Sequence, residues 1–294
     1  MKAVILGQRG GWHSESLRRA LAARGIEAGT YQVTHLTASV NGSPRLAVDG
    51  VALDQCDVVF VRAIPAGSLE QVVYRMDALR RLEQGGVRVV NSAWAIEHGV
   101  DKYYAAAVLQ DGGVPTPRTV VSERVDDALA AFEGLGGDVV VKPLFGSEGR
   151  GMVRVSDADT AYRVFRALEL GRYVYLVQEF VPHGNEDIRA LVVGDRVVAA
   201  MRRRGATWKT NAAQGATGEA VVPDAQLVEL SVRAARLVGA EHAGVDLLPC
   251  GDGSLSVVEV NTIPGWRALE AATGADVAGC LVDHVLEGAP WTTT

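Results

Sequence analysis

The chain has 294 residues, enough for two or three domains and for an enzyme, and its formal net charge of -6 argues against a protein that binds nucleic acid through a broad basic surface. Its cysteines, Cys56, Cys250 and Cys280, lie far apart without CxxC spacing, which disfavours a disulfide framework or a zinc site and is typical of a cytoplasmic protein. No apolar run approaches the roughly 18 residues that a membrane helix needs, so we expect no membrane association.

Residues 1–95 predict a small α/β domain. A short apolar strand at 2–6 runs into a glycine-bearing turn, and a helix follows through Ala23. Buried strands at 57–61 and 87–90 flank a helical pattern over 69–84. The turn GQRGG lacks a true GxGxxG motif, so a plain strand-to-helix turn is favoured over a dinucleotide site.

Two α+β units are expected after this domain, over 96–176 and 177–294. A helical pattern at 95–110 ends in an extended link at 112–117. The first unit then combines strands at 119–121, 138–142 and 152–155 with helices at 126–135 and 158–169. The second contains strands at 174–180, 188–193 and 196–202, a helix at 224–237, a hairpin at 244–261 and a final helix at 277–286.

The hairpin at 244–261 carries the strongest functional signal. Asp252-Gly253 predicts a two-residue turn, which places Asp246 directly opposite Glu259, with Asn261 on the same face. Two carboxylates that close repel each other unless a cation lies between them, and carboxylate and amide oxygens suit Mg²⁺. The alternative is the polar outer face of an exposed hairpin.

Lys142 ends a run of valines and precedes the segment PLFGSEGRG, whose glycines allow close approach to phosphates. The order of lysine and glycines differs from a Walker A loop, so we expect a hairpin lid. Lys102 offers a second cation. The alternative for both lysines is an ordinary solvated position.

Further polar groups are candidates for ligand binding. Asp187 and Arg189 are separated by one residue and share a face on a strand. Arg203, within the run Arg202–Arg204, offers a guanidinium group for carboxylate or phosphate, and Asn211 lies in a loop rich in alanine and glycine. Solvated surface is the alternative for these groups.

Taken in order, these motifs resemble the ATP-grasp ligases, and specifically the RimK-type α-L-glutamate ligase branch. The resemblance spans roughly residues 95–270 and rests on Asp101-Lys102, Val141-Lys142-Pro143-Leu144 with the glycine segment, Gln178-Glu179-Phe180, Asp187-Ile188-Arg189, Asn211, Asp246 and Glu259-Val260-Asn261. It implies an amino-terminal pre-ATP-grasp domain of α/β type, followed by two α+β ATP-grasp subdomains that enclose a nucleotide cleft.

The resemblance also implies roles for residues. Nucleotide binding falls to Lys102 and Lys142 at the phosphates, Glu179 and Phe180 at the adenine, Asp187 at the ribose with Arg189 beside it, the lid residues Gly146, Ser147, Gly149 and Gly151, and Asn211, Ala212 and Ala213 at the phosphate site. Metal binding falls to Asp246, Glu259 and Asn261, with two Mg²⁺ ions expected and Mn²⁺ as a substitute. Arg203, Lys142 and Arg267 are the expected catalytic residues, with the two arginines gripping a substrate carboxylate.

The expected activity is ATP-dependent joining of a carboxylate to an amine through an acyl phosphate, with release of ADP. L-glutamate is the expected amino acid. The stretch 262–267, with its bulky Trp266, resembles that of ligases acting on pterin-type carriers more than that of ligases modifying a ribosomal protein. A peptide carboxylate is left open as the acceptor. Ala212 and Ala213 depart from the family pattern after Asn211, which implies an altered acceptor or donor pocket. The alternatives are an inactive ATP-binding regulatory protein, a ligase with another amino acid or amine, and a nicotinamide-dependent oxidoreductase. A homo-oligomer is left open.

Overall fold

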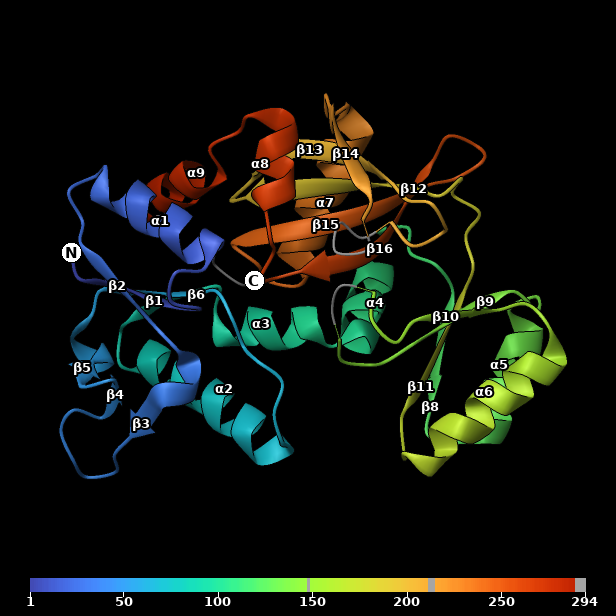
Figure 1. Cartoon of the computed structure of the whole chain (residues 1–294), viewed down its shortest axis with the longest axis horizontal. Coiled ribbons are helices and arrows are strands. Elements are labelled where there is room, and N and C mark those ends of the chain that lie inside the picture. Colours follow the sequence, from blue (N-terminus) through green and yellow to red (C-terminus); the bar gives the residue numbers. More distant parts are fainter. Residues whose placement is uncertain (147–148, 211–214, 289–294) are drawn as a thin grey trace.

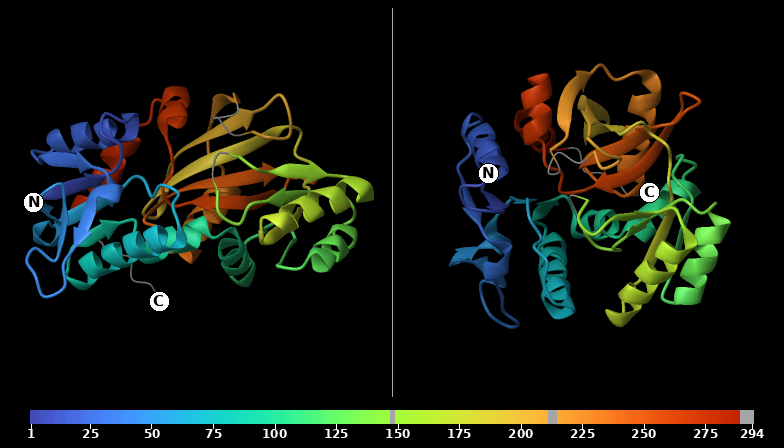
Figure 2. Two further views of the ribbon diagram at one scale, coloured as in Figure 1. Left: turned by 60° about the horizontal axis from the view of Figure 1, so that its bottom comes forward. Right: turned by 45° about the vertical axis from the view of Figure 1, so that its right-hand side comes forward.

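This computed structural model describes residues 1–146, 149–210 and 215–288. The molecule is elongated, with the amino-terminal strands at one end, the helices α5 and α6 at the other and the sheet of β12 to β16 between them (Figure 1). The further views keep this arrangement (Figure 2).

The amino-terminal layer is a parallel sheet with the strand order β2-β1-β6-β7. Alternate residues of β1 enter two cores: Ile5 packs with α1 and α9, whereas Leu6 packs with α2. Ser68 begins α2 with a capping box. The elements are β1 (Ala3–Leu6), α1 (Trp12–Ala22), β2 (Ala28–Tyr31), β6 (Val58–Val61), α2 (Leu69–Gln84) and β7 (Arg88–Val90).

A small antiparallel sheet, which the sequence analysis did not predict, extends this layer. Its strands are β3 (Leu36–Ala38), β4 (Leu46–Val48) and β5 (Val51–Ala52), with single 3-10 turns at Val33–His35 and Leu53–Gln55. Strands of two or three residues are too short to show an alternating pattern.

The helix predicted over 95–110 is two helices, α3 (Ala93–Val100) and α4 (Lys102–Asp111). The Asp101 side chain accepts hydrogen bonds from the backbone N–H groups of Tyr103 and Tyr104, at 2.9 and 3.0 Å, and so begins a new helix. The break makes Lys102 the first residue of α4.

The central sheet is antiparallel, with the order β10-β9-β11-β8. Val141 and Val177 pack against α5 and α6 in one core, which leaves Lys142 and Gln178 on the opposite face. The elements are β8 (Thr119–Ser122), α5 (Val125–Gly134), β9 (Val139–Lys142), β10 (Val153–Val155), α6 (Ala158–Leu170) and β11 (Tyr175–Glu179).

The large sheet is also antiparallel, with the order β14-β13-β12-β15-β16. One face, with Ala190 and Val245, packs against α4 and α7; the other, with Leu191 and Met201, packs against α1, α8 and α9. The elements are β12 (Glu186–Val193), β13 (Arg196–Arg204), β14 (Thr217–Val221), α7 (Ala225–Leu237), β15 (His242–Pro249), β16 (Leu255–Asn261), α8 (Arg267–Thr273) and α9 (Val277–Leu286).

The hairpin of β15 and β16 has the predicted pairing of Asp246 with Glu259, but the predicted two-residue turn is wrong. Cys250 N–H donates to the carbonyl of Ser254 at 2.9 Å, so the loop has one more residue, and Gly253 adopts a φ of 84°. A bulge at Val258 compensates for the shift, because Leu247 pairs with Val257 while Asp246 pairs with Glu259.

These layers agree with the predicted α/β domain and the two α+β units that follow it. Among the helices of the described residues, none has both the length and the apolar character to span a bilayer.

Candidate active site

A row of charged side chains crosses one face of the large sheet. Arg189 of β12 is in register with Asp246 of β15, which is in register with Glu259 of β16. In the adjacent row, Arg203 of β13 pairs with Asp187 of β12. Residues in register lie on one face, so the strand order, rather than sequence proximity, assembles these five side chains.

The carboxylates of Asp187 and Asp246 are bound by arginines. Arg189 donates to both oxygens of Asp246, with Nη2 2.7 Å from Oδ2, and Arg203 Nη2 lies 2.9 Å from Oδ1. Arg203 also donates to Asp187 at 2.7 and 2.5 Å, and the Thr210 hydroxyl donates to Asp187 at 2.6 Å. Asp246 is only 2% exposed and Asp187 4%. These groups therefore form a buried network whose formal charges balance.

The pKa of Asp246 reflects these partners. Burial alone would raise the pKa of this carboxyl, but the guanidinium groups of Arg189 and Arg203 outweigh burial and hold the pKa below its ordinary value. Asp246 is therefore ionised at neutral pH.

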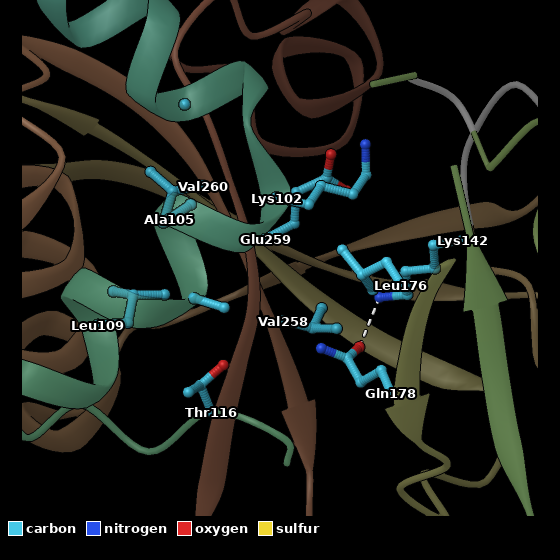
Figure 3. Close-up of a pocket in the computed structure, with 12 residues that line it drawn as sticks. Lys102, Ala105, Leu109, Thr116, Lys142, Leu176, Gln178, Val258, Glu259 and Val260 are labelled. Carbon is cyan, nitrogen blue, oxygen red and sulfur yellow. Dashed lines mark hydrogen bonds between the residues drawn. The ribbon is translucent and has the colours of Figure 1, made fainter. Parts of the chain in front are cut away.

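A small cavity lies beside this row, between α4, the central sheet and β16 (Figure 3). Lys102, Lys142 and Glu259 all line it. Lys142 Nζ donates to Gln178 Oε1 at 2.6 Å (Figure 3). Lys102 Nζ donates to the carbonyl of Gly146 at 2.7 Å. Two cations and a carboxylate thus share the wall of one cavity.

Burial lowers the pKa of both lysines. The pKa of Lys142 falls to about 8, against the opposing effect of the Glu259 carboxylate. The pKa of Lys102 is also lowered, again by burial and against Glu259. An anionic ligand between them would compensate for the lost hydration.

Gln178 contacts Lys142 directly but was absent from the predicted site residues. The available signal was the motif Gln178-Glu179-Phe180. In the structure, Leu176 pairs with Lys142, and Gln178 is two residues further along β11 on the same face. Thr116, which also lines the cavity, carried no signal in the sequence.

Other predicted site residues lie outside the cavity lining. Both carboxylate oxygens of Glu179 accept hydrogen bonds from Arg118, at 2.8 and 2.6 Å. The guanidinium carbon of Arg154 is 3.5 Å from the centroid of the Phe180 ring. Arg267 is exposed, with its guanidinium carbon 5.9 Å from the centroid of the Trp12 ring.

The lid is described in part. The backbone φ angles of Gly149 and Gly151 are 70° and 75°, values that favour glycine. Ser147, Asn211, Ala212 and Ala213 lie outside the described residues.

The predicted metal donors fit Mg²⁺ in chemistry and partly in arrangement. Asp246 and Glu259 are paired in register, and Asn261 follows on the same strand. However, guanidinium groups bind both oxygens of Asp246, and Asn261 Oδ1 accepts a hydrogen bond from Ile263 N–H at 3.0 Å. Within the described residues, no three His, Cys, Asp or Glu side chains are grouped closely enough to hold a metal ion. A divalent ion at this position would therefore need further oxygen ligands, and Mg²⁺ commonly takes them from water and phosphates.

Family models match both parts of the chain. The RimK-like ATP-grasp domain matches residues 99–285, and the RimK pre-ATP-grasp domain matches residues 1–96. The chain is 31% identical to the tetrahydromethanopterin:alpha-L-glutamate ligase of Methanococcus maripaludis, over 97% of this chain and 98% of that protein. It is 34% identical to a probable alpha-L-glutamate ligase of Teredinibacter turnerae, over 98% of this chain and 96% of that protein.

Solved structures give the same fold. The RimK domain ATP-grasp protein of Sphaerobacter thermophilus superposes with a TM-score of 0.77 at 26% identity, covering 97% of this chain and 99% of that one. The ATP-grasp ligase PsnB, in complex with a minimal precursor, Mg and ADP, superposes with a TM-score of 0.74 at 24% identity, covering 97% of each chain. The second likeness concerns the fold alone.

The expected pre-ATP-grasp and ATP-grasp architecture is thus confirmed, and the choice between a ligase and a nicotinamide-dependent oxidoreductase falls to the ligase. The chain belongs to the RimK-like ATP-grasp family, and it is an ATP-dependent, ADP-forming ligase.

Proposed function

We propose that this ligase adds L-glutamate to a carboxylate through an acyl phosphate, and that the acceptor is a small cofactor precursor of pterin type. The cavity that Lys102, Lys142 and Glu259 line together carries the proposal, because it combines cations for phosphates with a carboxylate for metal. The amino acid and the acceptor are supported by two relatives named as tetrahydromethanopterin:alpha-L-glutamate ligases, 31% and 32% identical to this chain.

The nucleotide phosphates lie between the two lysines in this proposal. Lys102 exchanges its bond to the Gly146 carbonyl for phosphate oxygens, and the lid with Gly149 and Gly151 covers them. Contacts with the phosphates are also proposed for four residues that lie outside the described ones: Ser147, Asn211, Ala212 and Ala213. Asp246, Glu259 and Asn261 hold metal with the nucleotide, and two ions, replaceable by Mn²⁺, are proposed.

Adenine and ribose contacts require rearrangement. Glu179 reaches the adenine only if it releases Arg118, and Asp187 reaches the ribose only if it releases Arg203. The same bonds keep Arg203 from a substrate carboxylate. Exposed Arg267 is better placed to grip a carboxylate that arrives from solvent.

The reaction has two steps. An acceptor carboxylate oxygen attacks the γ-phosphorus, the bond to the β,γ-bridging oxygen breaks, and ADP leaves. The amine nitrogen of glutamate then attacks the acyl carbon, a C–N bond forms, phosphate leaves with the carboxylate oxygen, and the amine loses a proton. Lys102 and Lys142 offset charge on the transferring phosphoryl group, and bound Mg²⁺ adds to this electrostatic stabilisation. The closed lid excludes water that would hydrolyse the acyl phosphate.

A screen of ADP release tests the substrates. The purified enzyme is supplied with ATP, Mg²⁺, one amino acid and one carboxylate acceptor, and products are weighed by mass spectrometry. We expect ADP release that needs both substrates, and a product heavier by one glutamyl residue. If ADP is released only with a different amino acid, that amino acid replaces glutamate in the proposal and the ligase chemistry stands.

Glu259→Gln tests the metal role of the cavity carboxylate. The change keeps size and removes the negative charge, so we expect loss of amine-dependent ADP release by a factor on the order of 1,000. Glu229→Gln, on the exposed surface of α7, is the matched control and should retain activity. Turnover that survives Glu259→Gln would remove this residue from the metal site.

A further inference from the structure

The carboxylate of Asp246 is already paired with a cationic side chain. The Arg189 guanidinium binds both of its carboxylate oxygens, and the two residues are in register on β12 and β15. Arg189 is 8% exposed, so this ion pair is largely shielded from solvent. Coordination of a divalent ion by Asp246, as proposed above, requires the same oxygens.

Gly244 provides the space in which the Arg189 guanidinium lies. A Cβ atom at position 244 would be 2.7 Å from Arg189 Nη1 and 3.0 Å from Pro264 Cβ. Gly244 is not among the glycines with positive φ, so backbone conformation does not require glycine there. Gly244 also pairs with Asn261, another proposed metal donor. The guanidinium therefore lies over the strand positions that carry the proposed metal site.

The charges and the hydrogen-bond partners of the two arginines indicate which one a metal ion would displace from Asp246. Two arginines balance two aspartates in the network, so a divalent ion added at Asp246 would leave an excess of positive charge in a buried place. Arg203 has Asp187 as a second partner, through two hydrogen bonds. Among the described residues, Asp246 is the only carboxylate paired with Arg189. Arg189 loses the fewest bonds when it moves.

We propose that Arg189 occupies the metal site of the ion-free enzyme and that a divalent ion binds Asp246 only by displacing the Arg189 guanidinium. The proposal rests on the metal role of Asp246 in the proposed function. The arginine and the ion thus compete for the same carboxylate oxygens. This competition explains why Asp246 is in register with Glu259 although a guanidinium group binds both of its oxygens.

Binding of Mn²⁺ to the nucleotide-free enzyme, measured by electron paramagnetic resonance, tests the exchange. Arg189→Gln removes the competing cation, so we expect the Kd for Mn²⁺ to fall at least about tenfold relative to the unmodified protein. Arg189→Gln combined with Asp246→Asn should lose that gain. Arg154→Gln, which removes a guanidinium paired with Asp138 elsewhere, should leave the Kd unchanged.

Gly244→Ala provides a second route that retains all charges. The added methyl group crowds the Arg189 guanidinium, so Mn²⁺ should again bind more tightly. Thermal unfolding of each variant identifies those that fold, and the comparison uses only these. Equal Kd values in the unmodified protein and both folded variants would overturn the exchange, as would a gain that survives Asp246→Asn.

Measurements with ATP present separate this proposal from the function on which it rests. If all the proteins bind Mn²⁺ with ATP and Arg189→Gln has no effect without it, the exchange is wrong and the metal site stands. If none of them binds Mn²⁺ even with ATP, both the metal site and the exchange are overturned.

Discussion

Lys142 links the pH of the medium to nucleotide binding. Its pKa of about 8 means that the ammonium group loses its proton as pH rises through that value. The same depressed pKa makes the free energy of unfolding rise with pH between about 8 and the unfolded value, because the unfolded state binds more protons there. Weaker ATP binding at high pH would therefore not reflect loss of the fold.

We predict that the affinity for ATP falls about tenfold between about pH 7 and about pH 9, since only the protonated amine binds phosphate well. Lys142→Arg keeps its charge over this range, so its affinity should change little. Isothermal titration calorimetry measures both, with Lys2→Arg at the exposed amino terminus as the control. An equal pH dependence in Lys142→Arg would contradict the role of this lysine.

The motifs in the sequence predicted which of these residues lie together better than they predicted the residues' hydrogen-bond partners. Lys102, Lys142 and Glu259 were predicted from their motifs, and they line one cavity. The arginine that occupies Asp246 was not foreseen, because β12 and β15 are separated along the chain by β13, β14 and α7. Pairing between distant strands depends on the whole sheet, and residue spacing alone does not reveal it.

Among the elements, helices with clear ends were the most predictable. The bounds of α2 and α9 agree with the predicted ranges, and Ser68 and Asp276 cap their first turns. The break between α3 and α4 was missed, although Asp101 is a favoured capping residue, because the apolar pattern continues across it. Helical periodicity alone therefore did not locate this boundary.

The hairpin that carries Asp246 and Glu259 depends on Gly253 rather than Gly251. Gly253 has a φ of 84°, so Gly253→Ala should lower the free energy of unfolding by about 1 kcal/mol. Gly251 is not among the positive-φ residues and has open space around it, so Gly251→Ala should be nearly neutral. Urea unfolding compares the two. Equal losses would mean that the loop does not constrain residue 253 as described.

At the scale of the whole molecule, Asn91 joins the amino-terminal layer to the large sheet. Its Nδ2 donates to the carbonyls of His242 and Thr262, at 2.7 and 2.6 Å, and its Oδ1 accepts from the N–H groups of Glu241 and His242, at 2.7 and 3.1 Å. The side chain is fully buried. One amide thus fixes the start of β15 and the end of β16 against β7.

We predict that Asn91→Ala lowers the free energy of unfolding by about 3 kcal/mol, because it leaves buried carbonyl and N–H groups without partners. Asn91→Asp should also destabilise, since its carboxylate faces two carbonyls that need a donor. Chemical unfolding monitored by circular dichroism gives both values. A loss below about 0.5 kcal/mol for both variants would show that this junction adds little to stability.

The layers themselves were predictable from the alternation of strands and helices. The positions at which one domain ends and the next begins were not. The domain boundaries drawn at 95 and 176 stay predictions. The core that contains Ile5, Met201 and Leu281 is shared by the amino-terminal layer, the large sheet and α9, so packing there crosses the first boundary. Residue patterns along one segment do not report such shared packing.

The central claim is that magnesium and a triphosphate meet between the two lysines and the carboxyl end of β16. A crystal structure with Mn²⁺ and a non-hydrolysable ATP analogue tests it most directly, because anomalous scattering locates the ion. We expect an ion bound by Asp246, Glu259 and Asn261, with phosphate oxygens beside Lys102 and Lys142. Nucleotide bound elsewhere, or these side chains turned to solvent with no ion among them, would contradict it.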